Sequence, residues 1–332
     1  MSAPLQERIN PHSTIKISFD GREALETPRF ILGYWGIRGL GEGIRMMLSV
    51  AKANHWNAMY DSLDGTEEGS EDQQAYRNDK KMLKEEYHAS LMNLPFLIDC
   101  DANNRIIVQT NAILTYIGRK VNMMGRFEED LIKIEELLGE TMDLRTRMVI
   151  FAYGPSHDKA GAEGVVKVGR FHFDKIEHFL VNEAKEMGQA FLVGTNYTPP
   201  DFHMYEMMVQ YEALAKFYEL PALFDKETTK YPKLTEYKAA FEQLPEVKSY
   251  LEDDLRGKLP IPFNNPSAGY GSDPATGGKY QWGQAAPWRQ LGVKELVLGG
   301  EKENGNKEGA ASSANQESSS TTTPEAKRQK TE

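Results

Sequence analysis

The order of predicted strands and helices constrains the fold of this chain more than any other feature. Short β-prone runs alternate with helical periodicity between residues 29 and 121, and only helical periodicity follows, from 122 to about 260. The first part reads strand, helix, strand and then strand, strand, helix, an order that fits helices packed on one small sheet. The sequence therefore predicts an α+β N-terminal domain at 29–121 and an all-α domain at 122–260.

The predicted strands are short apolar runs bounded by turn residues, and they cover 30–35, 56–60, 96–98 and 105–108. Glycines follow the first run, and helical spacing then begins. The last two runs lie at hairpin distance. The acidic, glycine-containing segment 61–79 is predicted to be a loop.

The second domain is predicted from apolar residues at helical spacing in segments separated by Gly, Pro and Asn. These segments cover 128–149, 163–187, 200–218, 233–241 and 245–255. Thr198 and Asp201 have the spacing of a capping box ahead of the third segment, which predicts the start of a helix there.

Three further segments flank the two domains. Residues 1–28 form an N-terminal extension, and residues 261–298 form an extension rich in Pro, Gly and aromatic residues. Residues 299–332 have too few apolar side chains to offset the entropy of ordering and are predicted to be disordered. The basic cluster Lys327–Lys330 is compatible with a nuclear import signal or with a solvated terminus.

Composition narrows the classes of partner. A net charge of -10 opposes binding to nucleic acid or to anionic membranes, and no apolar run has the length of a membrane span. The single cysteine, Cys100, excludes an intramolecular disulfide and fits a reducing compartment, so we expect a cytoplasmic protein. The seven histidines show no spacing typical of metal ligands, and no metal cofactor is expected.

Four motifs in the same order and spacing resemble the mu class of glutathione transferases. They cover Ile31–Leu40, Asn93–Asp99, Gln109–Leu114, and Thr141–Asp143 with Tyr153–Pro155. The resemblance extends from about Arg29 to Pro262. It implies a thioredoxin-like domain followed by a helical one, a homodimer, and conjugation of glutathione, as co-substrate, to hydrophobic electrophiles in detoxification.

The chemistry of such an enzyme requires a thiolate, because the ionised sulfur is the nucleophile and a free thiol has a pKa of about 8.5. A phenol can donate a hydrogen bond to the sulfur without adding charge, which stabilises the thiolate by about 1.5 to 3 kcal/mol. The resemblance identifies Tyr34, at the end of the first strand, as this catalytic phenol.

The resemblance also places glutathione against a set of side chains from both domains: Trp35, Leu40, Tyr76, Lys80, Lys84, Asn93, Leu94, Pro95, Gln109, Thr110 and Asp143. Leu94 and Pro95 would form a cis-proline turn, and Thr110 would hold the γ-glutamyl carboxylate at a helix N-terminus. Asp143 would reach the γ-glutamyl amine of glutathione on the other subunit. Lys80 and Lys84 are equal candidates for the glycyl end.

The electrophile pocket implied by the resemblance contains Ile37, Met142 and Tyr153. Gly36 replaces an Asp of the mu pattern, and Leu91 replaces the aromatic side chain that plugs the partner subunit. Two other functions stay open on the same fold. One is a carrier or scaffold without turnover, and the other is a glutathione-dependent isomerase or peroxidase.

Overall fold

The computed structural model describes residues 4–9, 14–15, 27–60, 71–155, 157–184, 190–227 and 230–252. Residues 61–70 of the predicted loop lie outside the described residues. So do the 261–298 extension, the 299–332 tail and the basic cluster at its end.

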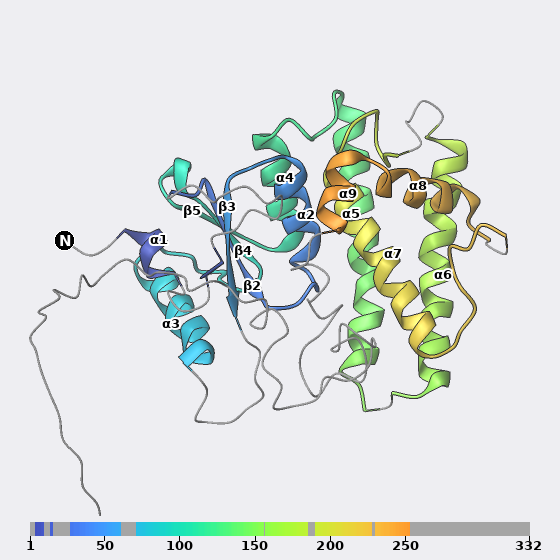
Figure 1. Ribbon diagram of the computed structural model, residues 1–332, viewed down its shortest axis with the longest axis horizontal. Helices are drawn as coiled ribbons and strands as arrows, with labels where there is room; N and C mark the ends of the chain where they lie inside the picture. The colour runs from blue at the N-terminus through green and yellow to red at the C-terminus, as the bar shows by residue number, and fades with distance from the viewer. Residues whose placement is uncertain are drawn as a thin grey trace, which may run out of the picture. The chain divides into compact units, whose positions relative to one another are not determined.

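In the described part of the chain, five strands form one mixed sheet in the order β1-β3-β2-β4-β5 (Figure 1). The strands are β1 (Thr14–Ile15), β2 (Phe30–Trp35), β3 (His55–Tyr60), β4 (Phe96–Asp99) and β5 (Arg105–Val108). Among the described strands, β2 and β3 are the only pair that runs parallel, because helix α2 (Glu42–Val50) connects them as a crossover. Helix α3 (Glu71–Glu85) precedes β4, and α4 (Thr110–Lys120) follows β5.

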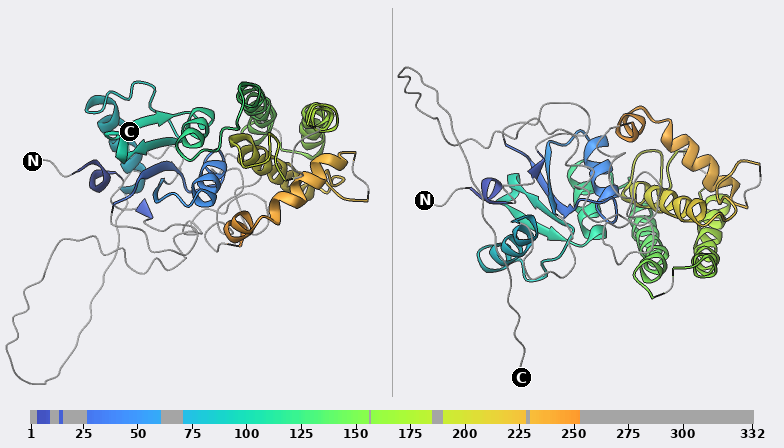
Figure 2. Two further views of the ribbon diagram at one scale, coloured as in Figure 1. Left: turned by 90° about the horizontal axis from the view of Figure 1, so that it is seen from above. Right: turned by 60° about the horizontal axis from the view of Figure 1, so that its bottom comes forward.

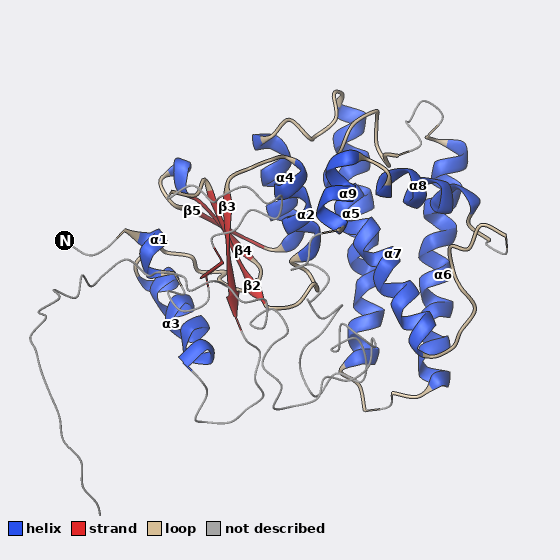
Figure 3. Cartoon of the chain, in the orientation of Figure 1, coloured by secondary structure: helices blue, strands red, loops and turns tan. Residues whose placement is uncertain are grey.

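The chain after α4 is described as helix only (Figure 3). Its elements are α5 (Glu128–Ala152), α6 (Lys159–Asn182), α7 (Pro199–Phe217), α8 (Pro232–Glu242) and α9 (Pro245–Leu251). Helix α7 begins with the predicted capping box: the Asp201 carboxylate accepts the backbone N–H of Thr198 at 2.7 Å. The predicted fold class, a thioredoxin-like α+β domain followed by an all-α domain, is confirmed.

The two faces of the sheet are covered by different helices. Phe30, Leu32 and Leu97 belong to a core shared with α2, α4 and the helical part of the chain. Ile31 and Ile98 belong to a second core shared with α1 (Leu5–Arg8) and α3. Helix α2 contacts both α7 and α9, and the views in Figures 1 and 2 agree that α2 lies between the sheet and the helical part.

The loop prediction is wrong for residues 71–79, which form the first part of α3. Three buried residues at helical spacing, Ala75, Asp79 and Leu83, face the second core or its border. The Tyr60 hydroxyl donates a hydrogen bond of 2.6 Å to the Asp79 carboxylate. The sequence analysis missed this buried helix face because the segment is acidic and because Asp79, one of the three buried residues, is itself charged.

The N-terminal extension contributes α1 and β1, which the sequence analysis did not predict. Strand β1 pairs antiparallel with β3. The side chains of Leu5 and Ile9 are 2% and 1% exposed, and the Arg8 guanidinium forms two 2.8 Å hydrogen bonds with Glu86 just after α3. The segment therefore packs against the helix that precedes the predicted glutathione turn.

Replacing Leu5 with alanine is expected to lower the free energy of unfolding by about 2 to 5 kcal/mol, because the change leaves a cavity in a closed core. Glu7→Ala, on the exposed side of the same short helix, is the matched control and should change it by about 0.5 kcal/mol or less. Urea unfolding measures both. Equal effects of the two substitutions would show that α1 does not dock as described.

No helix in the described part of the chain is both long and apolar enough to cross a membrane.

Candidate active site

Tyr34 lies at the carboxyl end of β2 and is enclosed by the loop that follows. Its side chain is 4% exposed, and its hydroxyl oxygen accepts the backbone N–H of Leu40 at 2.9 Å. Gly39, with φ +40°, and Gly41 pass close to this side chain. A Cβ on Gly39 would lie 2.7 Å from the Tyr34 oxygen, and a Cβ on Gly41 would lie 2.5 Å from the Tyr34 ring. The loop thus fixes the phenol while leaving its O–H proton available, since no hydrogen bond from it to another described residue is found.

A buried cluster of charged side chains holds this loop. The Arg45 guanidinium donates to the carbonyls of Ile37 at 2.7 Å and Trp35 at 3.1 Å. Arg38 forms an ion pair of 2.6 Å with Glu206 of α7, and Glu42 lies 3.8 Å from Arg38 and 3.6 Å from Arg45. All four charged side chains of this buried charge cluster are at most 7% exposed.

The charges of this cluster compensate one another. Burial acts to lower the pKa of Arg38, but the carboxylates of Glu206 and Glu42 outweigh it and raise that pKa above its ordinary value. Gln210, one turn after Glu206, donates to Glu206 at 2.8 Å and to the carbonyl of Gly39 at 3.4 Å. The sequence analysis missed these residues. A Glu and a Gln at i, i+4 within the apolar run of α7 were the available signal.

Several predicted glutathione residues meet beside Tyr34. Tyr34, Ile37 and Leu94 share the second core, and Leu40 packs against it. The Trp35 and Tyr76 rings are in edge contact, with centroids 5.2 Å apart, and the Lys80 ammonium lies 5.7 Å from the Tyr76 ring centre.

Lys84, the other candidate for the glycyl end, is exposed one turn further along α3.

The turn before β4 and the start of α4 each have a local feature that bears on glutathione binding. The Leu94–Pro95 peptide bond is cis, as the resemblance implied. Gln109 has a φ of 76°, an unfavourable value for a side-chain-bearing residue of the kind that clusters at ligand sites. Thr110 is 1% exposed and its hydroxyl oxygen has no hydrogen-bond partner among the described residues. The N-terminus of α4 therefore offers a donor and a favourable dipole for an anion.

The remaining predicted residues lie on exposed positions or on α5. Asn93 and Asp143 are exposed, Met142 is half-buried, and Tyr153, directly after α5, is 44% exposed. Among the described residues, neither Met142 nor Asn93 forms a hydrogen bond or ion pair with Tyr34. Arg145 of α5 interacts electrostatically with both Tyr34 and Tyr153. Burial lowers the pKa of Arg145, and the two tyrosines offset this only in part.

His203 of α7 lies beside Arg145 and was not predicted. It is 3% exposed, and neither ring nitrogen has a hydrogen-bond partner among the described residues. Burial, and to a smaller extent the Arg145 cation, lower its pKa from 6.5 to about 3. The ring is therefore neutral at physiological pH.

This depressed pKa predicts how stability depends on pH. In the unfolded chain His203 binds a proton below pH 6.5, but in the folded chain it does so only near pH 3. The free energy of unfolding is therefore highest above pH 6.5 and decreases as the pH falls below that value. Between pH 7 and pH 5 the wild type is expected to lose about 2 kcal/mol more than His203→Leu. Urea unfolding at the two pH values measures this difference. If the wild type and His203→Leu lose the same free energy of unfolding, His203 is protonated in the folded chain and the prediction is wrong.

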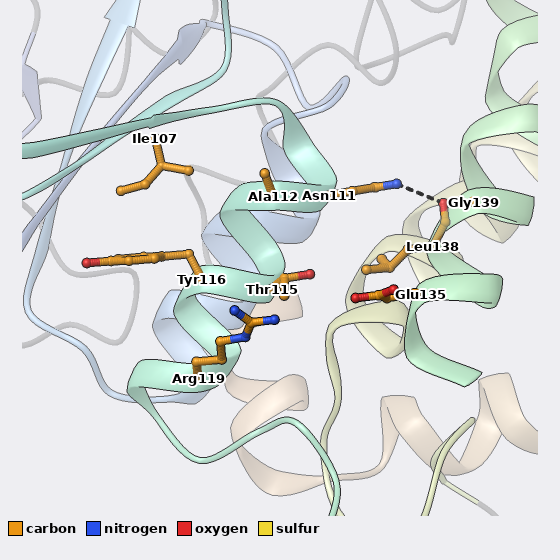
Figure 4. A pocket seen from close by; sticks show the side chains of 9 residues that line it. All are labelled: Ile107, Asn111, Ala112, Thr115, Tyr116, Arg119, Glu135, Leu138 and Gly139. Carbon is orange, nitrogen blue, oxygen red and sulfur yellow. Dashed lines mark hydrogen bonds between the residues drawn. The ribbon is translucent and has the colours of Figure 1, made fainter. Parts of the chain in front are cut away.

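A groove of about 470 Å³ lies elsewhere, between α4 and α5 (Figure 4). Asn111 crosses it and donates to the carbonyl of Leu138 at 3.1 Å. None of the predicted catalytic, glutathione or electrophile residues lines this groove. Within the described ranges, no cluster of three or more His, Cys, Asp or Glu side chains could hold a metal ion.

Comparison with known proteins agrees with this arrangement. The model of the glutathione S-transferase C-terminal domain family matches residues 142–254. The chain is 30% identical over 244 residues to glutathione S-transferase Mu 3 of Macaca fuscata fuscata, which covers 74% of this chain and 96% of the relative. It is 29% identical over 246 residues to human glutathione S-transferase Mu 3, with the same shares covered. For mouse glutathione S-transferase Mu 6 the identity is 29% over 242 residues, covering 73% and 98%.

The chain belongs to the glutathione S-transferase family and is similar to its mu-class members.

Proposed function

We propose that this protein catalyses the attack of the glutathione thiolate on hydrophobic electrophiles, with Tyr34 donating the hydrogen bond that stabilises the thiolate. The observation that carries the proposal is the state of the Tyr34 hydroxyl. Its oxygen accepts the Leu40 N–H at 2.9 Å, and a phenol whose oxygen already accepts a hydrogen bond is a stronger donor through its proton. The family membership and the names of the relatives support transferase activity.

Glutathione is the co-substrate in this proposal and would lie along the residues that meet beside Tyr34. Thr110 and the N-terminus of α4 suit its γ-glutamyl carboxylate, because the buried Thr110 hydroxyl has no hydrogen-bond partner in the described part of the chain. Leu94 would pair with its cysteinyl amide. Trp35, Tyr76 and Lys80 would hold its glycyl carboxylate, and the contact of Lys80 with Tyr76 favours Lys80 over the exposed Lys84.

The experiment is steady-state conjugation of glutathione to a generic aryl halide, beside calorimetric binding of glutathione to the same purified protein. We expect both turnover and binding. Tight binding without turnover would replace the transferase proposal with the carrier function. Absence of binding would show that the assigned glutathione residues are wrong. We place this activity in the cytoplasm, in detoxification.

The proposal includes a homodimer in which Asp143 reaches glutathione on the neighbouring subunit. Asp143 is exposed on α5, and the apolar side chain of Leu91 is 78% exposed in the single chain, so a partner would cover it favourably. We expect the wild type to sediment as a dimer and Leu91→Glu to shift the equilibrium toward monomer. A monomeric wild type at micromolar concentration would contradict the dimer.

A further inference from the structure

A buried hydrogen bond joins α3 to the sheet beside the residues proposed for the glycyl end of glutathione. Tyr60, the last residue of β3, is fully buried, and its hydroxyl donates at 2.6 Å to the carboxylate of Asp79, which is 5% exposed. Burial, and then the charge of Asp79, raise the pKa of the Tyr60 hydroxyl well above its ordinary value. The hydroxyl therefore keeps its proton and acts as the donor.

The ring of Tyr60 also lies beside two elements that carry proposed glutathione residues. Its centroid is 5.4 Å from that of Tyr76 on α3 and 6.3 Å from that of Phe96, which follows Pro95 of the turn before β4. Tyr76 is in turn 5.2 Å, centroid to centroid, from Trp35. One buried side chain thus contacts both the helix at the glycyl end and the strand after the turn.

The place of Asp79 on α3 lets this hydrogen bond set the rotation of the helix. At 3.6 residues per turn, Tyr76 and Lys80 lie about 60° and 100° around the axis from Asp79, on the same side of it. The other buried residues described on this helix, Ala75 and Leu83, are apolar and pack without a fixed direction. A hydrogen bond is directional, so the bond to β3 determines which way Tyr76 and Lys80 face.

Loss of the Tyr60 hydroxyl would take a donor away from a buried carboxylate. A buried charge is stable only while it is hydrogen-bonded, so α3 would have to shift until water reaches Asp79. That shift would carry Tyr76 and Lys80 away from Trp35. Tyr34 would stay in place, because the loop after β2 encloses it and α3 does not.

We propose that Tyr60 and Asp79 are a positioning pair for glutathione: their hydrogen bond holds α3 in the rotation that brings Tyr76 and Lys80 to the glycyl carboxylate. This inference rests on the proposed function. It adds two residues that set the affinity for glutathione without touching it.

The test measures glutathione affinity and turnover in Tyr60→Phe, which keeps the buried ring and removes the donor. The Kd from calorimetry and the KM for glutathione should rise about tenfold, the size of one hydrogen bond to a charged group. The kcat at saturating glutathione should stay within about twofold of the wild type, since Tyr34 is not moved. Asp79→Asn keeps an acceptor for the Tyr60 hydroxyl and should raise the Kd less.

Tyr116→Phe is the matched control for the loss of a tyrosine donor. Its hydroxyl also donates to a carboxylate, that of Asp99 at 2.7 Å, but none of the residues proposed to bind glutathione takes part in that bond. We expect this variant to keep the wild-type Kd for glutathione.

A neutral analogue of glutathione locates the effect along the substrate. The glycyl amide of glutathione lacks the charge that Lys80 would hold, so the wild type should bind it more weakly than glutathione. Tyr60→Phe should bind the two with nearly the same Kd, because the contacts to the glycyl carboxylate are already lost. If Tyr60→Phe is too unstable to purify, the same comparison in Asp79→Asn decides the inference.

Three results would overturn the inference. An unchanged Kd for glutathione in Tyr60→Phe is one. An equal rise for glutathione and its amide is another, because the pair would then support the fold as a whole. A lower kcat with a raised pKa of the bound thiol is the third, because the pair would then act on Tyr34.

The wild type alone separates this inference from the proposed function. Failure of the wild type to bind glutathione would overturn both, whereas equal binding of glutathione and its glycyl amide would overturn this inference alone.

Discussion

Replacing Tyr34 with phenylalanine is expected to lower kcat/KM for glutathione conjugation by about tenfold or more, because the substitution removes the donor to the thiolate. The phenylalanine ring fits the space between Gly39 and Gly41, so packing around it should be retained. The loss should therefore come from the sulfur and not from the fold. Steady-state kinetics over a range of pH measures it.

The pH profile separates this cause from a loss of folding. With the hydroxyl removed, the apparent pKa of the bound thiol should rise by about one to two units, toward the value of free glutathione. Tyr116→Phe is the matched control, because it also removes a tyrosine hydroxyl, but one that lies outside the candidate site. That hydroxyl donates a hydrogen bond of 2.7 Å to Asp99. Equal activity losses in the two variants would contradict the role assigned to Tyr34.

Replacing Arg38 with leucine is expected to lower the free energy of unfolding by about 3 to 5 kcal/mol, because it leaves two buried carboxylates without their shared cation. Glu206 is 1% exposed and Glu42 is fully buried, so neither can be hydrated without opening the structure. The same change should weaken glutathione turnover, since this buried charge cluster holds the loop around Tyr34. Urea unfolding and steady-state kinetics measure the two effects.

The double variant Arg38→Leu, Glu206→Leu is the control for this prediction. Removing both partners takes away the ion pair and most of the uncompensated charge, so the double variant should be more stable than Arg38→Leu alone. If the two substitutions destabilise additively, the 2.6 Å pair is not a coupled unit.

The strands and the position of Tyr34 could be predicted because their signals are local. The apolar run 30–35, the glycines after it and the hairpin spacing of 96–98 and 105–108 each arise within a few neighbouring residues. The roles of Thr110 and Leu94 came from a resemblance. The structure adds a Thr110 hydroxyl that has no partner among the residues it describes, and a cis Leu94–Pro95 bond. Both agree with those roles without testing them.

The residues that surround Tyr34 from other elements could not be predicted in the same way. Arg38 and Glu206 are 168 positions apart, and nothing in either local pattern selects the other as its partner. In the sequence, Arg145 cannot be distinguished from a solvent-exposed charge on a long helix. Its interaction with Tyr34 arises only in the folded chain, where α5 packs against α7. The predicted loop failed at 71–79 for a related reason, since the Tyr60 partner of Asp79 lies on β3.

The most direct test of the central claim is a titration of glutathione bound to the wild-type protein, followed by the ultraviolet absorbance of its thiolate. The account predicts that the bound thiol ionises with a pKa below the value of about 8.5 for a free cysteine thiol, and that Tyr34→Phe restores a value near it. A bound thiol that titrates like free glutathione in the wild type would contradict the assignment of Tyr34 as the group that stabilises the thiolate.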